Sequence, residues 1–375
     1  MMNKIAKLSL ITFSVCCFLS CNENKAKQET TKETTTLKDA FKDNFQIGVA
    51  INQHQINESD TTSAKLIANE FSSLSPENNL KWMYIHPQPD VFNFEQPDKY
   101  VALGNKHNMQ VVGHTLVWHS QLGEWVNQIK DSTEMIAHLE NHINTIVSRY
   151  KGKIDDWDVV NEALNEDGTL RESIFLEILG EGYLERAYKL AAKADPDAAL
   201  AYNDYNLTKP EKREGAIRLV KQLQAAGAKI DGIGMQGHWS LNGPSIEEIE
   251  ESIIAYSELG IKVMITELDI TVLPNPWDLE GAEVSQNFEG SEKMNPYPEG
   301  LPDSVQVQLA ERYEEIFKLF LKHEDKIDRV TFWGLNDGNS WLNNWPIDGR
   351  TNYPLLFDRN QNAKMAYDRI VALKK

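Results

Sequence analysis

A regular alternation of short apolar runs with longer amphipathic stretches begins at Leu37 and continues toward the C-terminus. Each apolar run is four to six residues long. Such an alternation is typical of β-α units arranged around a parallel sheet. It predicts eight strands, at residues 46–51, 70–74, 109–114, 156–160, 199–202, 232–236, 263–267 and 330–333.

Helices are predicted between these strands, at residues 135–149, 183–194, 209–226, 246–259 and 305–323. Ser132 or Thr133 is expected to cap the first of them, and Gly227 and Gly260 follow two others. Eight strands with intervening helices fit a single α/β catalytic domain of the (β/α)8 TIM-barrel type over residues 37–375. A doubly wound sheet would use fewer strands and a glycine-rich phosphate-binding turn, which the sequence lacks.

The first 20 residues have the layout of a secretory signal peptide, with two lysines, no acidic residue and an apolar run over residues 8–19. The run is too short to span a bilayer comfortably. It ends in FLSC, which resembles the cleavage box of bacterial lipoproteins, with Phe18 in place of the usual leucine. The resemblance implies that Cys21 is the lipidated first residue of the mature chain. An ordinary signal peptide and a retained anchor are the alternatives.

Residues 22–36 read NENKAKQETTKETTT and contain no large apolar side chain. Because such a segment cannot bury enough surface to fold, residues 21–36 are predicted to be a flexible tether. A tether after a lipidated cysteine implies an exported domain anchored to a bacterial membrane, periplasmic or at the cell surface, and otherwise a secreted one. The membrane is then contacted only through the lipid. We expect a monomer.

Charge and cysteine placement exclude several classes of function. The 38 basic and 56 acidic residues give a formal net charge of -18, which argues against a nucleic-acid partner. All three cysteines lie within the first 21 residues, so the predicted barrel holds no disulfide and no thiolate metal site. The sequence also lacks an HExxH motif, and we expect the chemistry to need neither a metal nor a cofactor.

Polar residues follow the predicted strands where each strand ends. In a barrel these ends meet at one mouth, where the active site lies. Carboxylates, imidazoles, amides and indoles are expected to converge there. The strand ends read GHTLVWHSQ at 113–121, WDVVNEA at 157–163, YNDYN at 202–206, MQGHW at 235–239, MITELDI at 264–270 and FWGLNDGNSW at 332–341.

Glu162 and Glu267 form the most informative pair, because each comes directly after an apolar strand. A single glutamate at such a position is more often a solvated or capping carboxylate. Two of them at one barrel mouth suit the cleavage of an acetal, which needs one carboxyl to protonate the leaving oxygen and another at the anomeric carbon. Retaining and inverting mechanisms both remain open at this point, because they differ in the distance between the carboxyls.

Four of these motifs together carry a resemblance to a known family. The sequences NEA at 161–163, TELD at 266–269, GHTLVWH at 113–119 and WGLND at 333–337 resemble those of glycoside hydrolase family 10, the endo-β-1,4-xylanases, and the likeness runs from about residue 39 to the C-terminus. It implies a retaining enzyme that acts on xylan or xylo-oligosaccharides. By this resemblance Glu162 is the general acid/base and Glu267 the nucleophile, and we expect the charge of Glu267 to raise the pKa of Glu162.

The resemblance also assigns substrate-binding roles. Asn161 would hold the 2-hydroxyl of the sugar at the cleavage site, and His238 with Asp269 would hydrogen-bond the nucleophile and keep it ionised. Trp333 and Trp341 would stack on sugar rings. Gln236 adds an amide at the same mouth. After strand three, a wall of the sugar-binding site would be formed by His114, Trp118, His119 and Gln121, and the hydroxyls of the next sugar would be bound by Glu77, Asn78 and Lys81.

Several alternatives stay open. The same barrel could act on another β-linked glycan, and a non-catalytic glycan-binding lipoprotein would keep the tryptophans without needing both glutamates. Residues 273–302 form a long irregular stretch with five prolines that is expected to wall the cleft, with a disordered insertion as the alternative. Tyr205 and Asn206 could touch the leaving-group side, and cleavage within the polymer rather than at its ends rests on the resemblance alone.

Overall fold

The computed structural model describes residues 35–279 and 281–374. The predicted signal peptide, Cys21 and all but the last two residues of the predicted tether lie outside the described residues. The first helix, α1 (Leu37–Phe41), begins where the barrel was expected to begin. Thr36 caps it, because its side chain accepts the backbone N–H of Asp39.

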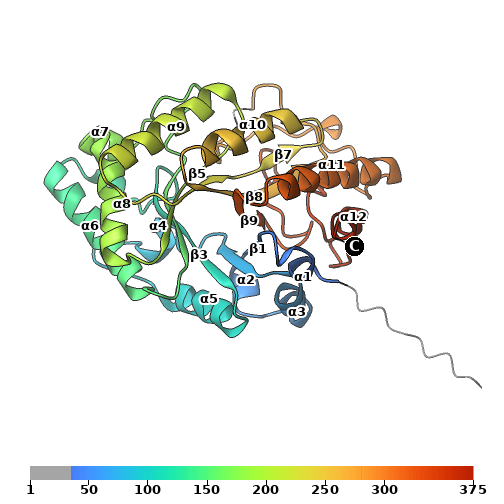
Figure 1. The fold of residues 1–375 in the computed structure, drawn as a ribbon, viewed down its shortest axis with the longest axis horizontal. Helices are drawn as coiled ribbons and strands as arrows, with labels where there is room; N and C mark the ends of the chain where they lie inside the picture. The colour runs from blue at the N-terminus through green and yellow to red at the C-terminus, as the bar shows by residue number, and fades with distance from the viewer. Residues whose placement is uncertain (1–34, 280, 375) are drawn as a thin grey trace, which may run out of the picture. The chain divides into compact units, whose positions relative to one another are not determined.

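Eight parallel strands close into a barrel, which confirms the predicted fold class (Figure 1). Each strand pairs with the next along the chain, and the last pairs with the first. A ninth short strand, β7 (His238–Ser240), pairs only with β8 and extends the mouth of the barrel. The barrel strands are β1 (Gln46–Ile51), β2 (Ser73–Pro76), β3 (Gln110–Trp118), β4 (Asp156–Asn161), β5 (Ala199–Asp204), β6 (Gly232–Met235), β8 (Lys262–Thr271) and β9 (Ile327–Phe332).

Helices surround the barrel in Figure 1 and cover its outer face. Among the described residues, none of them is both long enough and apolar enough to cross a bilayer. The longer helices are α3 (Thr61–Glu70), α5 (Glu95–Lys106), α6 (Ser132–Arg149), α8 (Gly182–Ala194), α9 (Pro210–Ala225), α10 (Ile246–Ser257), α11 (Asp303–Lys322) and α12 (Met365–Ala372). The short ones are α2 (Gln53–Ile56), α4 (Trp82–Ile85), α7 (Ile174–Leu179), η1 (Val126–Gln128), η2 (Glu292–Met294) and η3 (Trp341–Asn343).

Two local predictions were wrong. The second strand does not begin at Glu70, which is the last residue of α3; β2 starts at Ser73. The carboxylate of Glu70 accepts hydrogen bonds of 2.9 Å from the backbone N–H of Leu37 and the hydroxyl of Tyr367, so it belongs to the outer helical layer. The cap of α6 is Asp131 rather than Ser132 or Thr133, because its carboxylate accepts the backbone N–H of Glu134 at 2.9 Å.

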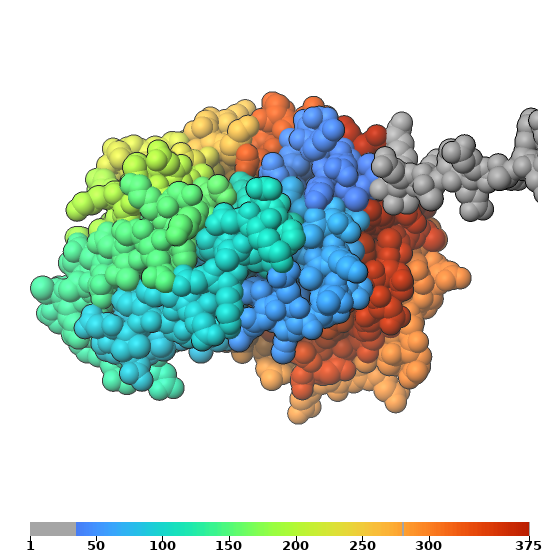
Figure 2. Space-filling view, turned by 90° about the horizontal axis from the view of Figure 1, so that it is seen from below, coloured from blue at the N-terminus to red at the C-terminus, as the bar shows by residue number. Residues whose placement is uncertain are grey.

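Barrel closure brings the two ends of the described chain together. β1 pairs with β9, and the ring centroids of Phe41 and Phe317 lie 5.3 Å apart. Figure 2 shows the blue N-terminal segments directly beside the red C-terminal ones. Where β3 pairs with β4, Gly113 lies against the Trp157 ring, and an added Cβ would be 2.1 Å from a ring carbon. This close packing fixes the register of β3 and β4, the strands that lead to His114 and Glu162.

Candidate active site

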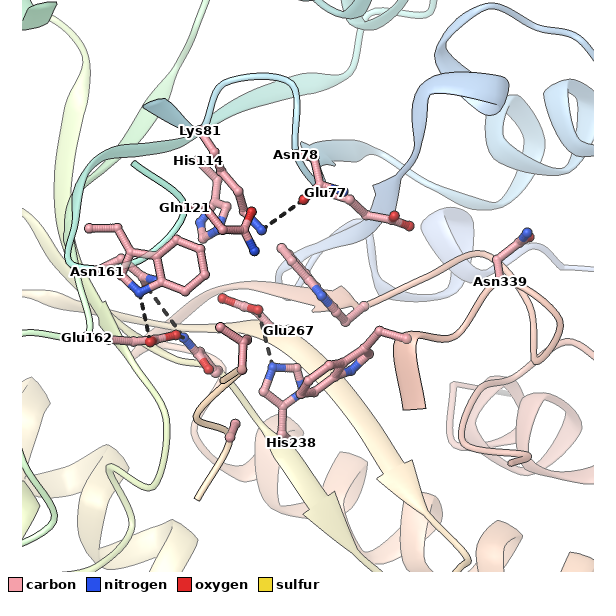
Figure 3. Close-up of a pocket in the computed structure, with 16 residues that line it drawn as sticks. Glu77, Asn78, Lys81, His114, Gln121, Asn161, Glu162, His238, Glu267 and Asn339 are labelled. Atoms are coloured by element: carbon pink, nitrogen blue, oxygen red, sulfur yellow. Dashed lines mark hydrogen bonds and ion pairs between the residues drawn. The ribbon is translucent and has the colours of Figure 1, made fainter. Parts of the chain in front are cut away.

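The carboxyl ends of the barrel strands open on a cleft lined by residues from several strand ends (Figure 3). Thirteen of the fifteen side chains expected at the catalytic centre line this cleft. The exceptions are Asp269, which lies behind His238, and His119, which borders a smaller cavity beside Glu162. The lining residues are Glu77, Asn78, Lys81, His114, Trp118, Gln121, Asn161, Glu162, Gln236, His238, Glu267, Ala282, Val284, Trp333, Asn339 and Trp341.

Glu162 comes directly after β4 in a left-handed backbone conformation, with φ of 56°. This conformation is uncommon for a residue with a Cβ and is found preferentially at functional sites. The indole N–H of Trp118 donates to Oε2 at 2.8 Å, and the amide of Gln236 donates to Oε1 at 2.9 Å. Only 4% of Glu162 is exposed. The carboxyl is therefore held in one orientation and shielded from water.

The surroundings of Glu162 raise the pKa of its carboxyl. Burial is the main cause, and the charge of Asp204 is the next one. Glu267 also raises this pKa, but it contributes less than either. Glu267 therefore acts in the expected direction, although desolvation by burial outweighs this neighbouring charge. A carboxyl with a raised pKa is suited to donate a proton near neutral pH.

Glu267, in the middle of β8, has the opposite electrostatic character. Burial alone would raise the pKa of its carboxyl, yet a hydrogen bond from His238 and the nearby charges of His114 and His238 hold it below the usual value. Nε2 of His238 lies 3.2 Å from Oε2 of Glu267, and its Nδ1 lies 3.1 Å from Oδ1 of Asp269. Although burial opposes it, the charge of Asp269 is the chief reason that the pKa of His238 rises to about 10. Glu267 thus stays ionised beside an imidazolium.

Side-chain amides connect the two glutamates. The amide nitrogen of Asn203 donates to Oε1 of Glu267 at 2.7 Å and to Oδ1 of Asn161 at 2.9 Å. The amide nitrogen of Gln236 lies 2.9 Å from Glu162 and 3.4 Å from the same oxygen of Asn161. Asn203 was not predicted as a site residue, because it lies inside β5 and not after it. It belongs to the polar sequence YNDYN at 202–206, which was the signal that could have indicated it.

One side of the cleft is formed by residues that follow β2. The ammonium of Lys81 donates to Oδ1 of Asn78 at 3.1 Å and lies 4.9 Å from the centroid of the Trp118 ring. Burial is the main cause that lowers the pKa of Lys81, while the charges of Glu267, Glu162 and Glu77 oppose it. Burial also raises the pKa of Glu77 to about 7. These groups offer both donors and acceptors to a ligand.

Two indoles and one imidazole also line the cleft. Trp333 and Trp341 are partly buried, and the N–H of Trp341 donates to Asp269 at 2.8 Å. Trp345 stacks on Trp341 with ring centroids 4.4 Å apart. His114 lies 2.9 Å from Asp158, which orients its ring in the cleft. Rigid, half-exposed aromatic faces of this kind pack well against sugar rings.

The long loop between β8 and α11 does wall the cleft, as expected, through Ala282 and Val284. These two residues and Asn339 were not predicted as lining residues, because irregular segments carry no periodic signal that reports which way a side chain points. Asn206 borders a neighbouring cavity that shares His238 and Ala282 with the catalytic cleft. Tyr205 is buried, and neither it nor Asn206 lines the cleft itself.

The arrangement can supply acid/base and nucleophilic chemistry from one pair of carboxyls. Glu162 and Glu267 face the same space in Figure 3 with opposite pKa shifts. Within residues 35–279 and 281–374, no group of three or more His, Cys, Asp or Glu side chains has the arrangement of a metal site.

Comparison with known proteins places this geometry in a family. The profile of Glycosyl hydrolase family 10 matches residues 36–373. Endo-1,4-beta-xylanase A of Xylanibacter ruminicola is 43% identical, over 90% of this chain and 93% of its own length. A beta-1,4-xylanase of Dictyoglomus thermophilum is 41% identical, over 97% of this chain and 96% of its own.

Solved structures agree with these matches. The structure of a GH10 endoxylanase from a sugarcane soil metagenome superposes with a TM-score of 0.87 at 46% sequence identity, covering 90% of this chain and 99% of that one. The xylanase XynB of Paenibacillus barcinonensis superposes with a TM-score of 0.82 at 35% identity, covering 91% and 99%. The fold, the paired glutamates and these relatives lead to one conclusion: the chain belongs to glycosyl hydrolase family 10.

Proposed function

We propose that this protein is a retaining endo-1,4-β-xylanase that hydrolyses internal β-1,4 bonds of xylan. One observation carries the proposal. Two buried glutamates share a cleft, and their surroundings raise the pKa of Glu162 while lowering that of Glu267. Because the two pKa values are shifted in opposite directions, Glu162 is assigned as the acid and Glu267 as the nucleophile. The relatives named as xylanases support xylan as the substrate class.

The first step breaks the glycosidic bond. Glu162 donates its proton to the leaving oxygen while the Glu267 carboxylate attacks the anomeric carbon and forms a covalent glycosyl-enzyme. Asn161 is well placed to hydrogen-bond the 2-hydroxyl of the sugar, because Asn203 and Gln236 fix its amide from two sides. Such a bond strengthens as positive charge develops on the sugar ring. It therefore stabilises the transition state more than the bound substrate and lowers the activation barrier of the reaction.

The second step releases the sugar. Glu162, now ionised, takes a proton from water, and the water oxygen attacks the anomeric carbon as the bond to Glu267 breaks. Two inversions restore the original β configuration. The proton that Glu162 gains prepares it for the next cycle, and His238 stabilises the carboxylate that leaves.

The sugar units on either side of the cleavage point bind by different groups. Lys81, Asn78 and Glu77 supply charged and neutral hydrogen-bonding partners for hydroxyls on the non-leaving side. Trp333 and Trp341 supply apolar faces for ring stacking.

Substrate class is tested with linear β-1,4-linked hexasaccharides of xylose and of glucose. We expect the xylose oligomer to be cut to mixed di-, tri- and tetrasaccharides at least 100-fold faster, because xylose lacks a hydroxymethyl group that the cleft would have to accommodate. Equal rates would favour a broader β-glycanase. Cleavage of neither, with binding retained, would favour a glycan-binding lipoprotein.

We also propose that the enzyme is exported and tethered by a lipid on Cys21. The support is the sequence of residues 1–36, with its apolar run, FLSC box and polar tether. Metabolic labelling with a palmitate analogue should mark the wild type and not the Cys21→Ala variant. Release of unlabelled wild-type enzyme into the medium would contradict the anchor and favour an ordinary signal peptide.

A further inference from the structure

In the long loop between β8 and α11, the side chain of Glu283 contacts two neighbouring segments at the barrel mouth. Its Oε2 accepts a hydrogen bond of 2.7 Å from Nη1 of Arg171 and lies 3.3 Å from Nε2 of His119. Its Oε1 accepts the backbone N–H of Ser285, and its carbonyl oxygen accepts the indole N–H of Trp345. Glu283 therefore joins this loop to the segments that follow β3, β4 and β9.

The ion pair is sheltered, which makes it stronger than a surface pair. The side chains of Glu283, Arg171 and His119 are 20%, 14% and 16% exposed. The hydrogen bond from His119 is the main reason that the pKa of Glu283 falls to about 2, so the carboxylate is charged throughout the range in which the enzyme would work. Partly desolvated, hydrogen-bonded charge pairs of this kind hold segments in place better than exposed ones.

The two neighbours of Glu283 in the chain line the catalytic cleft. Ala282 and Val284 share that cleft with Glu162 and Glu267, and Ala282 is only 6% exposed. Both side chains are small and apolar. The segment therefore presents a smooth apolar wall to whatever fills the cleft, while the charged residue between them holds the wall in position.

The preceding residue presses the segment against the β5 loop. Gly281 has φ of 57°, and a Cβ added there would lie 2.4 Å from a ring carbon of Tyr205. The Tyr205 hydroxyl also accepts a hydrogen bond from Arg171. The backbone at Gly281 thus packs on the Tyr205 ring, and Arg171 binds both Tyr205 and Glu283. These contacts restrict the movement of the segment that carries Ala282 and Val284.

The wall stands on the leaving-group side of the cleft. Arg171 and His119 border a small cavity together with Glu162 and Trp118, so the residues that Glu283 contacts surround the acid. The acid must lie beside the leaving oxygen. Lys81, on the other side of the cleft, has no contact with this segment among the described interactions.

We propose that Glu283 is a positioning residue that fixes Ala282 and Val284 as the wall of the leaving-group sugar site. It thereby sets the affinity of that site for a sugar, both as the departing part of xylan and as an acceptor that replaces water in the second step. The inference rests on the proposed function, since it takes Glu162 to be the acid/base. In transfer, the acceptor hydroxyl gives its proton to Glu162 and its oxygen bonds to the anomeric carbon as Glu267 leaves.

The test uses Glu283→Gln in the full enzyme, with an aryl β-xylobioside as donor and xylobiose as acceptor. The ratio of transfer product to hydrolysis product should fall about tenfold at fixed acceptor concentration, as expected for losing one charged hydrogen bond at the site. The kcat/KM for xylotetraose should fall by a similar factor through KM. The rate of aryl release without acceptor should stay within about twofold, because an activated leaving group depends little on this wall.

Matched controls separate positioning from general damage. Glu289→Gln makes the same charge change at an exposed position of the same loop and should leave the transfer ratio unchanged. Combining Glu283→Gln with Arg171→Gln should lower the ratio no further than Arg171→Gln alone, since the two residues act as one pair. If Glu283→Gln does not fold, Glu283→Asp gives the same comparison with a shortened reach.

An unchanged transfer ratio in a folded Glu283→Gln enzyme, with wild-type cleavage of xylotetraose, would overturn the inference and leave the proposed function intact. Equal losses in aryl release and in transfer would also overturn it, because they would indicate a disturbed catalytic pair. Failure of the wild type to cleave any xylo-oligosaccharide would overturn the proposed function and the inference with it.

Discussion

Nε2 of His238 lies 3.2 Å from Oε2 of Glu267. The opposite ring nitrogen of His238 faces Asp269 at 3.1 Å, which keeps the imidazole protonated with a pKa of about 10. The proposed nucleophile therefore has a permanent cationic neighbour in a site where burial would otherwise neutralise it. The contacts from Asp269 through His238 to Glu267 therefore allow one cleft to hold a protonated acid and an ionised nucleophile at the same pH.

Replacement of His238 by glutamine tests how far this histidine lowers the pKa of Glu267 and supports activity. The pKa of Glu267 is expected to rise once the imidazolium is gone, so the acidic limb of the kcat/KM profile should move to higher pH. At neutral pH the loss should be about 10- to 100-fold, the usual effect of removing a charged hydrogen bond. A pH series of initial rates on a soluble xylan measures both. An unshifted acidic limb would contradict the assignment.

The acid/base role of Glu162 is tested by chemical rescue. Glu162→Ala should lose most activity on xylan but still react with an aryl glycoside whose leaving group needs no proton. Added azide should then speed turnover and give a β-glycosyl azide, because it attacks the glycosyl-enzyme without base assistance. Glu267→Ala, the matched removal of the nucleophile, should be inactive on every substrate. A rescue that yields an α-azide from Glu162→Ala would count against retention.

The glutamate pair, its strands and its barrel could be predicted because each of these residues follows an apolar strand and the strand ends must converge. Asn203 could not be found in this way, since its role depends on which neighbours face it inside the barrel. The cause of the raised pKa of Glu162 was also out of reach. Burial and the charge of Asp204 raise the pKa of Glu162 more than Glu267 does. This ranking depends on how the side chains pack at the barrel mouth, which the sequence does not give.

The error at Glu70 has a related origin. A short apolar run beside a helix can be read as helix or strand, and only the contacts of Glu70 with Leu37 and Tyr367 settle its place in α3. In the long loop, too, the sequence does not indicate which way each side chain points. Its proline content predicted a wall, but nothing in its sequence distinguished Glu283, which points to Arg171, from Ala282, which lines the cleft.

A buried lysine near the acid provides a stability test. Nζ of Lys212 lies 2.9 Å from Oδ1 of Asp204, and both side chains are fully buried. Lys212→Met leaves that carboxylate unpaired and should lower the free energy of unfolding by about 3 to 5 kcal/mol. Lys209→Met is the matched control, because Lys209 is half exposed and pairs with Glu166 at the surface, so about 0 to 1 kcal/mol is expected. Urea unfolding compares them, and equal losses would contradict the account.

Acid stability depends on a second buried pair. Nδ1 of His86 lies 3.1 Å from Nδ1 of His142, and neither residue is exposed. Burial, followed by the charge of His138, lowers the pKa of His86 to about 4. The unfolded chain binds a proton at His86 near pH 6.5 and the folded chain only near pH 4. The free energy of unfolding should therefore fall as the pH drops through this window, by up to about 3 kcal/mol from His86 alone.

Chemical denaturation at pH 7 and at pH 4.5 measures this loss. His86→Phe, which removes the titrating group but keeps an aromatic ring, should lose less stability between the two pH values than the wild type does. His54→Gln changes an exposed histidine and should behave as the wild type. The same loss in all three proteins would rule out His86 as a source of acid sensitivity.

The most direct test of the proposed mechanism is proton NMR of a linear β-1,4-xylo-oligosaccharide during the first minutes of digestion. Glu162 as acid and Glu267 as nucleophile require the β-anomer to appear first and the α-anomer only later, by mutarotation, together with products from internal bonds. An initial α-anomer would contradict the account, because a single displacement by water would then replace the covalent intermediate on Glu267.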